Sequence, residues 1–303
     1  MNDLLHRFIL RDAAVRGEVV SLDAAWRDVV RRHALPGAVR DHLGELSAAS
    51  LLLAATLKFD GSLVMQIHGD GPVALYVVDV DTAGSFRATV KVRDEAACPP
   101  DADLRALVDA TGRGRFVVTL DPRHRDRATA PYQGIVPFEG EHVAGVLEQY
   151  MQRSEQVPTR LWLAADAQRA TGLLLQRLPD EGGHHTPTDA DGWERMQMLA
   201  DTLDPAELLT LTPQQLLHRL FWQEKLEPLG TSDWRFRCTC SREKVGGMLR
   251  TLGRAEIDSI LAERGSIEVH CEYCNAAYAF DSVDAALLFA EDGSAAPGSA
   301  AHH

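Results

Sequence analysis

Four cysteines in the last quarter of the chain have the type and spacing to bind a metal ion. Cys238 and Cys240 form a C-x-C pair, and Cys271 and Cys274 form a C-x-x-C pair after thirty intervening residues. Zinc takes four soft ligands in a tetrahedron with bonds of about 2.3 Å, and two short-range pairs can supply them. In an extended strand the C-x-C sulfurs point the same way, with Cα atoms ~6.6 Å apart. The spacing therefore predicts a tetrathiolate zinc site.

Three interpretations of these thiols are open. The simplest is a zinc site that only stabilises the fold. Thiolates are also the oxidisable form of cysteine, so the same residues could form a redox switch. The third interpretation is a thiol–disulfide oxidoreductase that acts through Cys271-Glu272-Tyr273-Cys274. It is disfavoured because thioredoxin-like sites place C-x-x-C beside a βαβ unit, whereas this pair has a strand-like context.

The cysteines belong to a small module, residues 233–281, with a helical stretch and then a strand–turn–strand pattern around the second pair. It has few large apolar residues, so metal binding must supply much of its folding free energy, on the order of 10–16 kcal/mol. Oxidation would most easily join sequence neighbours, and so small a loop offers under ~2 kcal/mol of stabilisation. Local disulfides that replace the metal should therefore unfold the module, whereas a cross-link such as Cys240–Cys271 would keep it folded.

The charge of the chain disfavours nucleic acid as a partner. The net charge is −13, and residues 233–281 carry seven Lys/Arg against eight Asp/Glu. Four thiolates on one zinc ion would add a further charge of about −2. Phosphate backbones repel such a surface, so a zinc-ribbon nucleic-acid binder is a weak alternative.

The elements that must position these cysteines begin with a large N-terminal domain, residues 1–178. Strands and helices alternate there without a regular βαβ rhythm, which favours an α+β fold. The segment SLVMQIHGDGPVALYVVDVD predicts a hairpin around the turn GDGP. Apolar spacing predicts helices at 21–33, 36–59 and near 140–153, and strands at 84–92, 114–121 and 159–165.

Residues 179–232 are interpreted as a short, metastable helical linker that opens with a loop at 179–192. Residues 180–231 carry ten acids and three bases, so self-repulsion should make this segment marginal unless its apolar faces dock on a neighbour. Asp204-Pro205 and Thr212-Pro213 each predict a helix start. Apolar residues that could share helix faces, and that are core residues in the simplest interpretation, are Trp193, Met196, Leu199, Leu216, Leu220 and Phe221.

The rest of the chain is predicted to form a small C-terminal zinc-binding domain, residues 233–287, and a disordered tail, residues 288–303. No apolar run approaches the ~20 residues of a membrane span. The N-terminus MNDLLHRFIL carries charged residues inside its apolar run, unlike a signal peptide. We therefore expect a cytoplasmic protein without membrane contact, where paired cysteines bind metal or do redox chemistry more often than they form permanent disulfides.

Five segments of the chain carry a resemblance to a known family: FRCTCSREKVGGMLRTLG, GSIEVHCEYCNAAYAFD, TLKFDGSLVMQIHGDGP, PYQGIVPFEG and YMQRSEQVPTRLWLA. They resemble the 33-kDa heat-shock protein family, the redox-regulated holdase chaperones of the bacterial cytosol. The resemblance extends from about residue 1 to residue 285, and the cysteine motifs and their order are its most specific part. The His-bearing loop at 181–191 and the Ala/Gly-rich tail depart from the family pattern.

The resemblance implies a non-enzymatic function. It implies zinc on Cys238, Cys240, Cys271 and Cys274 in a reduced, inactive chaperone. Peroxide with heat, or hypochlorous acid, would then drive Cys238–Cys240 and Cys271–Cys274 disulfides and zinc loss. The linker would unfold, and the protein, dimeric when active, would bind unfolding clients without ATP. We expect oxidation to expose some of the six apolar linker residues, or the surface beneath them, to clients.

Overall fold

The computed structural model describes residues 3–124, 130–178, 189 and 191–290. The chain divides into two compact units, Met1–Arg237 and Cys238–His303, and each is described by itself. Their mixture of helices and antiparallel sheets confirms the predicted α+β class. None of the described helices is both long enough and apolar enough to cross a membrane.

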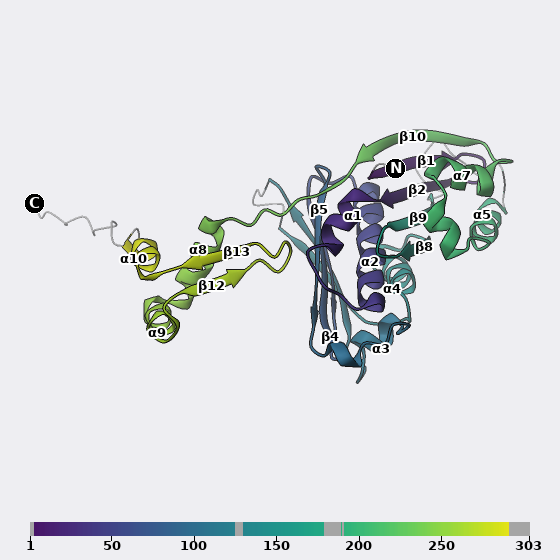
Figure 1. The fold of residues 1–303 in the computed structure, drawn as a ribbon. Helices are drawn as coiled ribbons and strands as arrows, with labels where there is room; N and C mark the ends of the chain where they lie inside the picture. Colours follow the sequence, from purple (N-terminus) through teal and green to yellow (C-terminus); the bar gives the residue numbers. More distant parts are fainter. Residues whose placement is uncertain (1–2, 125–129, 179–188, 190, 291–303) are drawn as a thin grey trace, which may run out of the picture. The chain divides into compact units, whose positions relative to one another are not determined.

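The first unit contains two largely antiparallel sheets with a long helix between them (Figure 1). One sheet has the strand order β10-β1-β2-β9-β8, and the other has the order β11-β5-β4-β3-β6-β7. The strands are β1 Leu4–Leu10, β2 Val15–Leu22, β3 Gly61–His68, β4 Val73–Asp81, β5 Ser85–Val92, β6 Arg115–Pro122, β7 Tyr132–Pro137, β8 Thr159–Ala165, β9 Ala170–Arg177, β10 Leu226–Asp233 and β11 Arg235–Phe236. The short strand β11 pairs in parallel with β5.

The helix between the sheets, α2 (Gly37–Thr56), is apolar on nearly all sides because both sheets cover it. Its residues Leu43, Leu46, Leu51 and Leu52 are fully buried in the larger core of the unit. The other elements of this region are α1 Ala24–Val30, the 3₁₀ turn η1 Glu95–Ala97, α3 Leu104–Val108, α4 Val143–Tyr150 and the π turn η2 Met151–Glu155.

Three short helices of the predicted linker, α5 (Gly192–Ala200), α6 (Pro205–Thr210) and α7 (Pro213–Phe221), pack on the five-stranded sheet. The helix starts at Asp204 and Thr212 are confirmed, and each has a capping box with proline at the first helical position. Between these helices and the sheet lies a second apolar cluster, which includes Phe8, Val19 and Leu173 from the strands.

Three expectations differ from the structure at element boundaries. The helix predicted at 21–33 is shorter in the structure, where α1 covers only Ala24–Val30. It starts later because β2 continues to Leu22 and pairs with β1 and β9. The end of the predicted helical linker forms β10, which pairs with β1. An edge strand tolerates Pro228 and Gly230, but both residue types are rare in strands, so the sequence pattern did not indicate β10. Helix α10 reaches Ala290, so the predicted tail overlaps its last turn. The rest of the tail, and most of the loop 181–191, lie outside the described residues.

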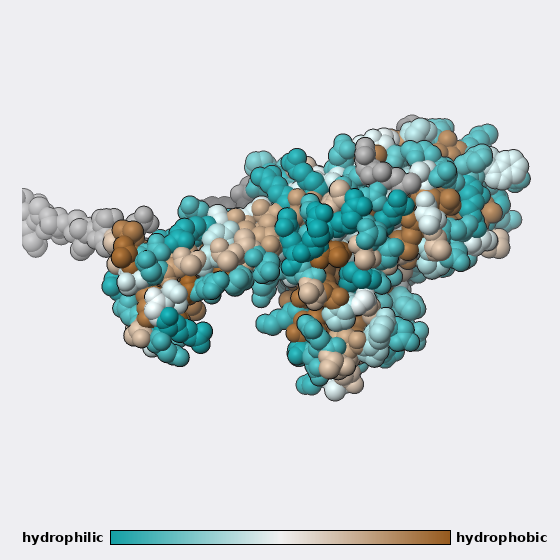
Figure 2. All heavy atoms as spheres, viewed as in Figure 1, coloured by the Kyte–Doolittle hydropathy of each residue, from teal (hydrophilic) through white to brown (hydrophobic). Residues whose placement is uncertain are grey.

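The second unit is small. Its elements are α8 Arg242–Leu252, α9 Arg254–Arg264, β12 Ile267–His270, β13 Ala277–Phe280 and α10 Ser282–Ala290. Five residues form its buried apolar cluster: Leu249, Ile257, Ile267, Phe280 and Ala285. Hydrophobic residues remain at its surface where α10 lies (Figures 1 and 2), and Val283 and Leu287 are mostly exposed. So small a core supports little folding free energy by itself.

Candidate metal centre

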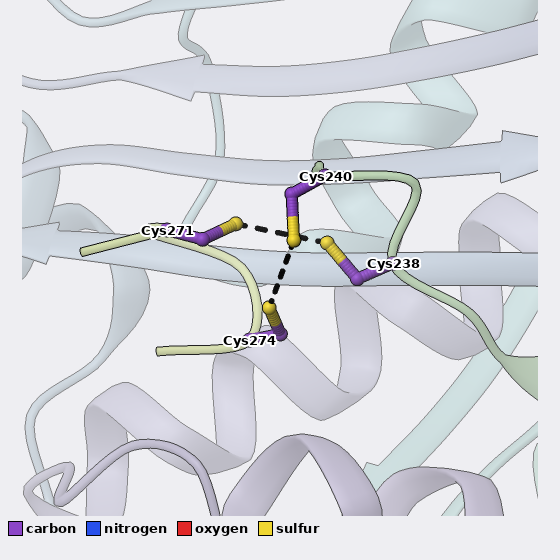
Figure 3. Close-up of side chains that lie close together, drawn as sticks. All are labelled: Cys238, Cys240, Cys271 and Cys274. Carbon is purple, nitrogen blue, oxygen red and sulfur yellow. Dashed lines mark hydrogen bonds between the residues drawn. The ribbon is translucent and has the colours of Figure 1, made fainter. Parts of the chain in front are cut away.

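The four cysteine sulfurs of the second unit converge on one point (Figure 3). Cys238 and Cys240 come from the segment before α8, and Cys271 and Cys274 come from the turn between β12 and β13. The Sγ atoms all lie within 4.8 Å of one another. The Sγ atoms of Cys238 and Cys271 are 3.6 Å apart, and those of Cys240 and Cys274 are 3.3 Å apart. In the described part of the chain, no other cluster of cysteine, histidine or acidic side chains could hold a metal ion.

The donor set fits a tetrahedral zinc ion. Zinc–sulfur bonds of about 2.3 Å place neighbouring sulfurs about 3.8 Å apart, close to the separations observed. A disulfide needs an S–S distance near 2.05 Å, and all five cysteines of the chain are free thiols. Four thiolates complete a coordination shell and leave no open position, which is typical of a structural rather than a catalytic zinc site.

Local structure presents each pair of sulfurs to the same point. After β12, the turn closes with hydrogen bonds from Asn275 N to Cys271 O (2.7 Å) and from Cys271 N to Ala276 O (3.0 Å). Asn275 has a φ of 58°, a left-handed conformation that asparagine tolerates. On the other side, Ser241 directly follows Cys240 and caps α8 by accepting a hydrogen bond from Lys244 N, so the helix begins at Arg242. The hairpin turn and the helix cap therefore fix the two halves of the site.

A residue that the sequence did not single out completes the site. The Tyr278 hydroxyl, on β13, donates a hydrogen bond to Cys240 Sγ over 3.1 Å. Burial disfavours ionisation of Cys240, but the hydrogen bonds from Tyr278 and the neighbouring thiols outweigh it and lower the pKa of Cys240 to about 7. Burial raises the pKa of Cys274 to about 12 and also raises that of Cys238.

The surroundings of the C-x-x-C pair are unlike those of a dithiol catalyst. Cys271 and Cys274 lie in a turn between two antiparallel strands, whereas thioredoxin-like sites lie beside a βαβ unit. The neighbouring His270 directs its ring to Glu268, with an Nε2–Oε1 distance of 3.1 Å. The fifth cysteine, Cys98, is buried in the first unit and donates to the carbonyl of Asp94.

The six apolar linker residues gather in one place. Met196, Leu216, Leu220 and Phe221 are buried in the second apolar cluster of the first unit. Trp193 and Leu199 pack against the same cluster and are partly buried. Their burial is as expected for the state with free thiols, and a part in client binding stays a prediction.

Polar contacts also join the linker helices to the sheet. The Asp201 carboxylate, at the end of α5, accepts hydrogen bonds from the Trp162 indole and the Arg160 guanidinium, both over 3.1 Å. Arg169 donates to the carbonyl of Leu209 over 2.6 Å and pairs with the buried Asp23. The sequence predicted an acidic linker, but it did not predict which bases of the first domain face it.

Comparisons with known proteins place these features in one family. The profile described as Hsp33 protein matches residues 3–281. The "33 kDa chaperonin" of Methylobacillus flagellatus is 46% identical over 290 residues, which cover 95% of each chain. The "33 kDa chaperonin" of Chromobacterium violaceum is 46% identical over 301 residues, which cover 99% of this chain and 98% of the relative.

A solved structure shares the fold at low sequence identity. The crystal structure of the 33 kDa chaperonin from Thermotoga maritima superposes with a TM-score of 0.78 at 22% identity, over 97% of this chain and 99% of the other. The family resemblance predicted from the cysteine motifs is thereby confirmed over nearly the whole length, and the chain belongs to the Hsp33 family of chaperones.

Proposed function

We propose that this chain is a redox-regulated, ATP-independent holdase, inactive when reduced and zinc-bound and activated by oxidation. The observation that carries the proposal is the convergence of four sulfurs from two distant segments in a unit whose described residues include five buried apolar ones. Cys238, Cys240, Cys271 and Cys274 hold the zinc. Zinc supplies the link between the two segments and a large part of the folding free energy of the unit.

The chemical step joins sequence neighbours. In each of the pairs Cys238–Cys240 and Cys271–Cys274, one S–S bond forms and the two thiolates give up two electrons. The O–O bond of one hydrogen peroxide molecule accepts these electrons and breaks, and with two protons from solvent two water molecules form. The two disulfides use all four zinc ligands, and apart from the main chain no covalent bond then connects the segment before α8 to the hairpin. The second unit therefore unfolds, because its own apolar core is too small to hold it.

Disulfide connectivity tests this step directly. In the folded unit, sulfur contacts of 3.6 Å and 3.3 Å join the two segments, Cys238 to Cys271 and Cys240 to Cys274. Cross-paired disulfides would keep the segments together, whereas neighbour disulfides release them. Peptide mapping of the peroxide-treated chain should find Cys238–Cys240 and Cys271–Cys274. A predominance of cross-paired cysteines in the active form would exclude the proposed switch.

The chaperone surface is proposed to lie where the linker docks. Residues 179–232 form the metastable element between the chaperone core, 1–178, and the redox domain, 233–287. Its undocking would expose the apolar cluster around Met196, Leu216 and Phe221 to unfolding clients in the cytosol. Exposed apolar surface of this kind also favours a homodimer of the active form.

Aggregation of a heat-denatured client tests the holdase function. The oxidised chain should suppress light scattering near equimolar ratio without ATP, and the reduced chain should not. The contrasting candidate, a thiol–disulfide oxidoreductase acting through Cys271 and Cys274, would instead turn over in an insulin-reduction assay. Catalysed reduction of insulin without suppression of aggregation would favour the oxidoreductase over the holdase.

A further inference from the structure

Tyr278 connects the two halves of the cysteine cluster. It lies on β13, in the same hairpin as Cys271 and Cys274, yet its hydroxyl donates to the sulfur of Cys240 on the other segment over 3.1 Å. The four sulfurs also contact one another, and the backbone N–H groups of Cys240 and Ala276 donate to the sulfurs of Cys238 and Cys274. Those backbone donors act within one segment, whereas the Tyr278 hydroxyl reaches from one segment to the other.

The position of the tyrosine ring is fixed by its surroundings. Tyr278 pairs with Val269 across the hairpin, and its ring packs against the apolar cluster of the second unit. The next residue along β13, Ala279, accepts a hydrogen bond from the Arg242 guanidinium over 2.8 Å. The same guanidinium lies 4.3 Å from the centre of the Phe280 ring and pairs with Asp284. The start of α8 is thus also tied to the two residues of β13 that follow Tyr278.

The hydrogen bond distinguishes between the chemical states of Cys240. A thiolate is a strong, charge-assisted acceptor, whereas the sulfur of a disulfide is neutral and accepts weakly. A donor aimed at this sulfur therefore favours the metal-bound thiolate over the oxidised form. Residues that orient metal ligands in this way typically contribute roughly 10- to 100-fold to metal affinity.

We propose that Tyr278 is a positioning residue for the zinc site, whose hydroxyl holds Cys240 in the ligand position and withdraws electron density from its thiolate. The inference rests on the proposed zinc site. Removal of the hydroxyl leaves the four ligands in place but weakens zinc retention and lets Cys240 react with peroxide more readily.

The test compares the wild-type full chain with Tyr278→Phe and with Arg242→Ala. Arg242→Ala removes the adjacent tie between α8 and β13 and keeps the hydroxyl, so it controls for a general loosening of the unit. Zinc affinity is measured by competition with a chromogenic chelator. Cobalt is then substituted for zinc, because the energy of the sulfur-to-cobalt charge-transfer band reports electron donation by the thiolates.

Tyr278→Phe should raise the apparent zinc dissociation constant roughly 10- to 100-fold and move the cobalt band to lower energy. Arg242→Ala should leave the band in place, whatever it does to affinity. An unchanged band and affinity in Tyr278→Phe would overturn the inference. So would a Tyr278→Phe chain that takes up no cobalt, since loss of one hydroxyl is expected to weaken the site and not to abolish it.

The wild-type chain separates this inference from the proposed function. If the wild-type protein takes up neither zinc nor cobalt, the proposed metal site fails and Tyr278 has no role in it. If the wild-type protein binds both metals and Tyr278→Phe behaves identically, only the role of Tyr278 fails.

Discussion

Each of the four clustered sulfurs would supply one quarter of the proposed coordination shell, and no other side chain among the described residues of the second unit belongs to a cluster that could hold a metal ion. Cys271→Ser should therefore abolish tight zinc binding and leave the second unit unfolded, because a serine hydroxyl is a poor ligand and the apolar core has five buried residues. Zinc content after dialysis against a weak chelator measures the effect.

The matched control is Cys98→Ser, which removes the thiol that lies buried in the first unit. It should retain one zinc per chain. Zinc retention by Cys271→Ser at the wild-type level would show that the four sulfurs do not act as one site.

The buried carboxyl group of Glu18 should make the stability of the first unit depend on pH. It is 4% exposed on β2 and one of its carboxyl oxygens has no hydrogen-bond partner among the described residues. Burial raises its pKa from 4.5 to about 8, against the opposing effect of Arg16 and Arg7. Because the folded state holds the proton more tightly than the unfolded state, stability is lost as pH rises from about 4.5 to about 8.

Glu18→Gln should remove this loss. At pH 9 the free energy of unfolding of Glu18→Gln should exceed that of the wild type by several kcal/mol, at about 1.4 kcal/mol per unit of pKa shift. Its urea midpoint should therefore be higher than that of the wild type at pH 9 and similar near pH 4. Tryptophan fluorescence follows the first unit alone, since all five tryptophans precede residue 238. The exposed Glu194→Gln is the control. Parallel pH profiles for Glu18→Gln and wild type would contradict the expected titration.

At the scale of single residues, the sequence predicts the candidate metal-binding cysteines better than the residues that contact them. The cysteines were identifiable because C-x-C and C-x-x-C spacings are rare outside metal and redox sites. Tyr278 was not, because a tyrosine in a β-rich run is equally expected as a packing residue. Its direction toward Cys240 depends on the register of β12 and β13, in which Tyr278 pairs with Val269.

In the proposed switch the linker is the element that undocks, and its first helix, α5, approaches the turn between β1 and β2 very closely. A Cβ on Gly192, at the start of α5, would lie 2.6 Å from the Cα of Ala13. Gly192→Ala should therefore displace α5 at a cost of about 1–3 kcal/mol, and the linker should open more readily. Limited trypsin cleavage at Arg195 and Arg219 should accelerate in the reduced protein.

The control for Gly192→Ala is Gly145→Ala in α4, where a Cβ would meet nothing within 4 Å. That change should be neutral or slightly stabilising, because alanine favours a helix by about 1 kcal/mol over glycine. Equal trypsin sensitivity of the two variants would mean that close packing at Ala13 does not hold the linker.

The sequence predicts most helices and central strands of this fold but not the edge strand β10. Helix α2 and the hairpin β3–β4 follow from strong apolar periodicity, and both are confirmed. Strand β10 has no such signal, since it contains Pro228 and Gly230 and is mostly exposed. It forms because β1 offers it an unpaired edge, which is a tertiary effect that no local pattern contains.

At the scale of the whole molecule, the acidic linker is balanced by bases of the first domain. Asp201 faces Arg160, and Glu227 faces Arg11. Exposed pairs of this kind contribute little, about 0–1 kcal/mol each, so docking depends mainly on the apolar cluster beneath α5 to α7. A linker with many acids and a modest apolar face is suited to the undocking that we propose for the oxidised protein.

The most direct test follows zinc release, thiol content and suppression of client aggregation in one sample during peroxide treatment at raised temperature. Zinc release, loss of four thiols and the onset of aggregation suppression should rise together, and reduction with zinc added back should reverse them. Suppression of aggregation by a chain that still holds its zinc and all four thiols would contradict the account.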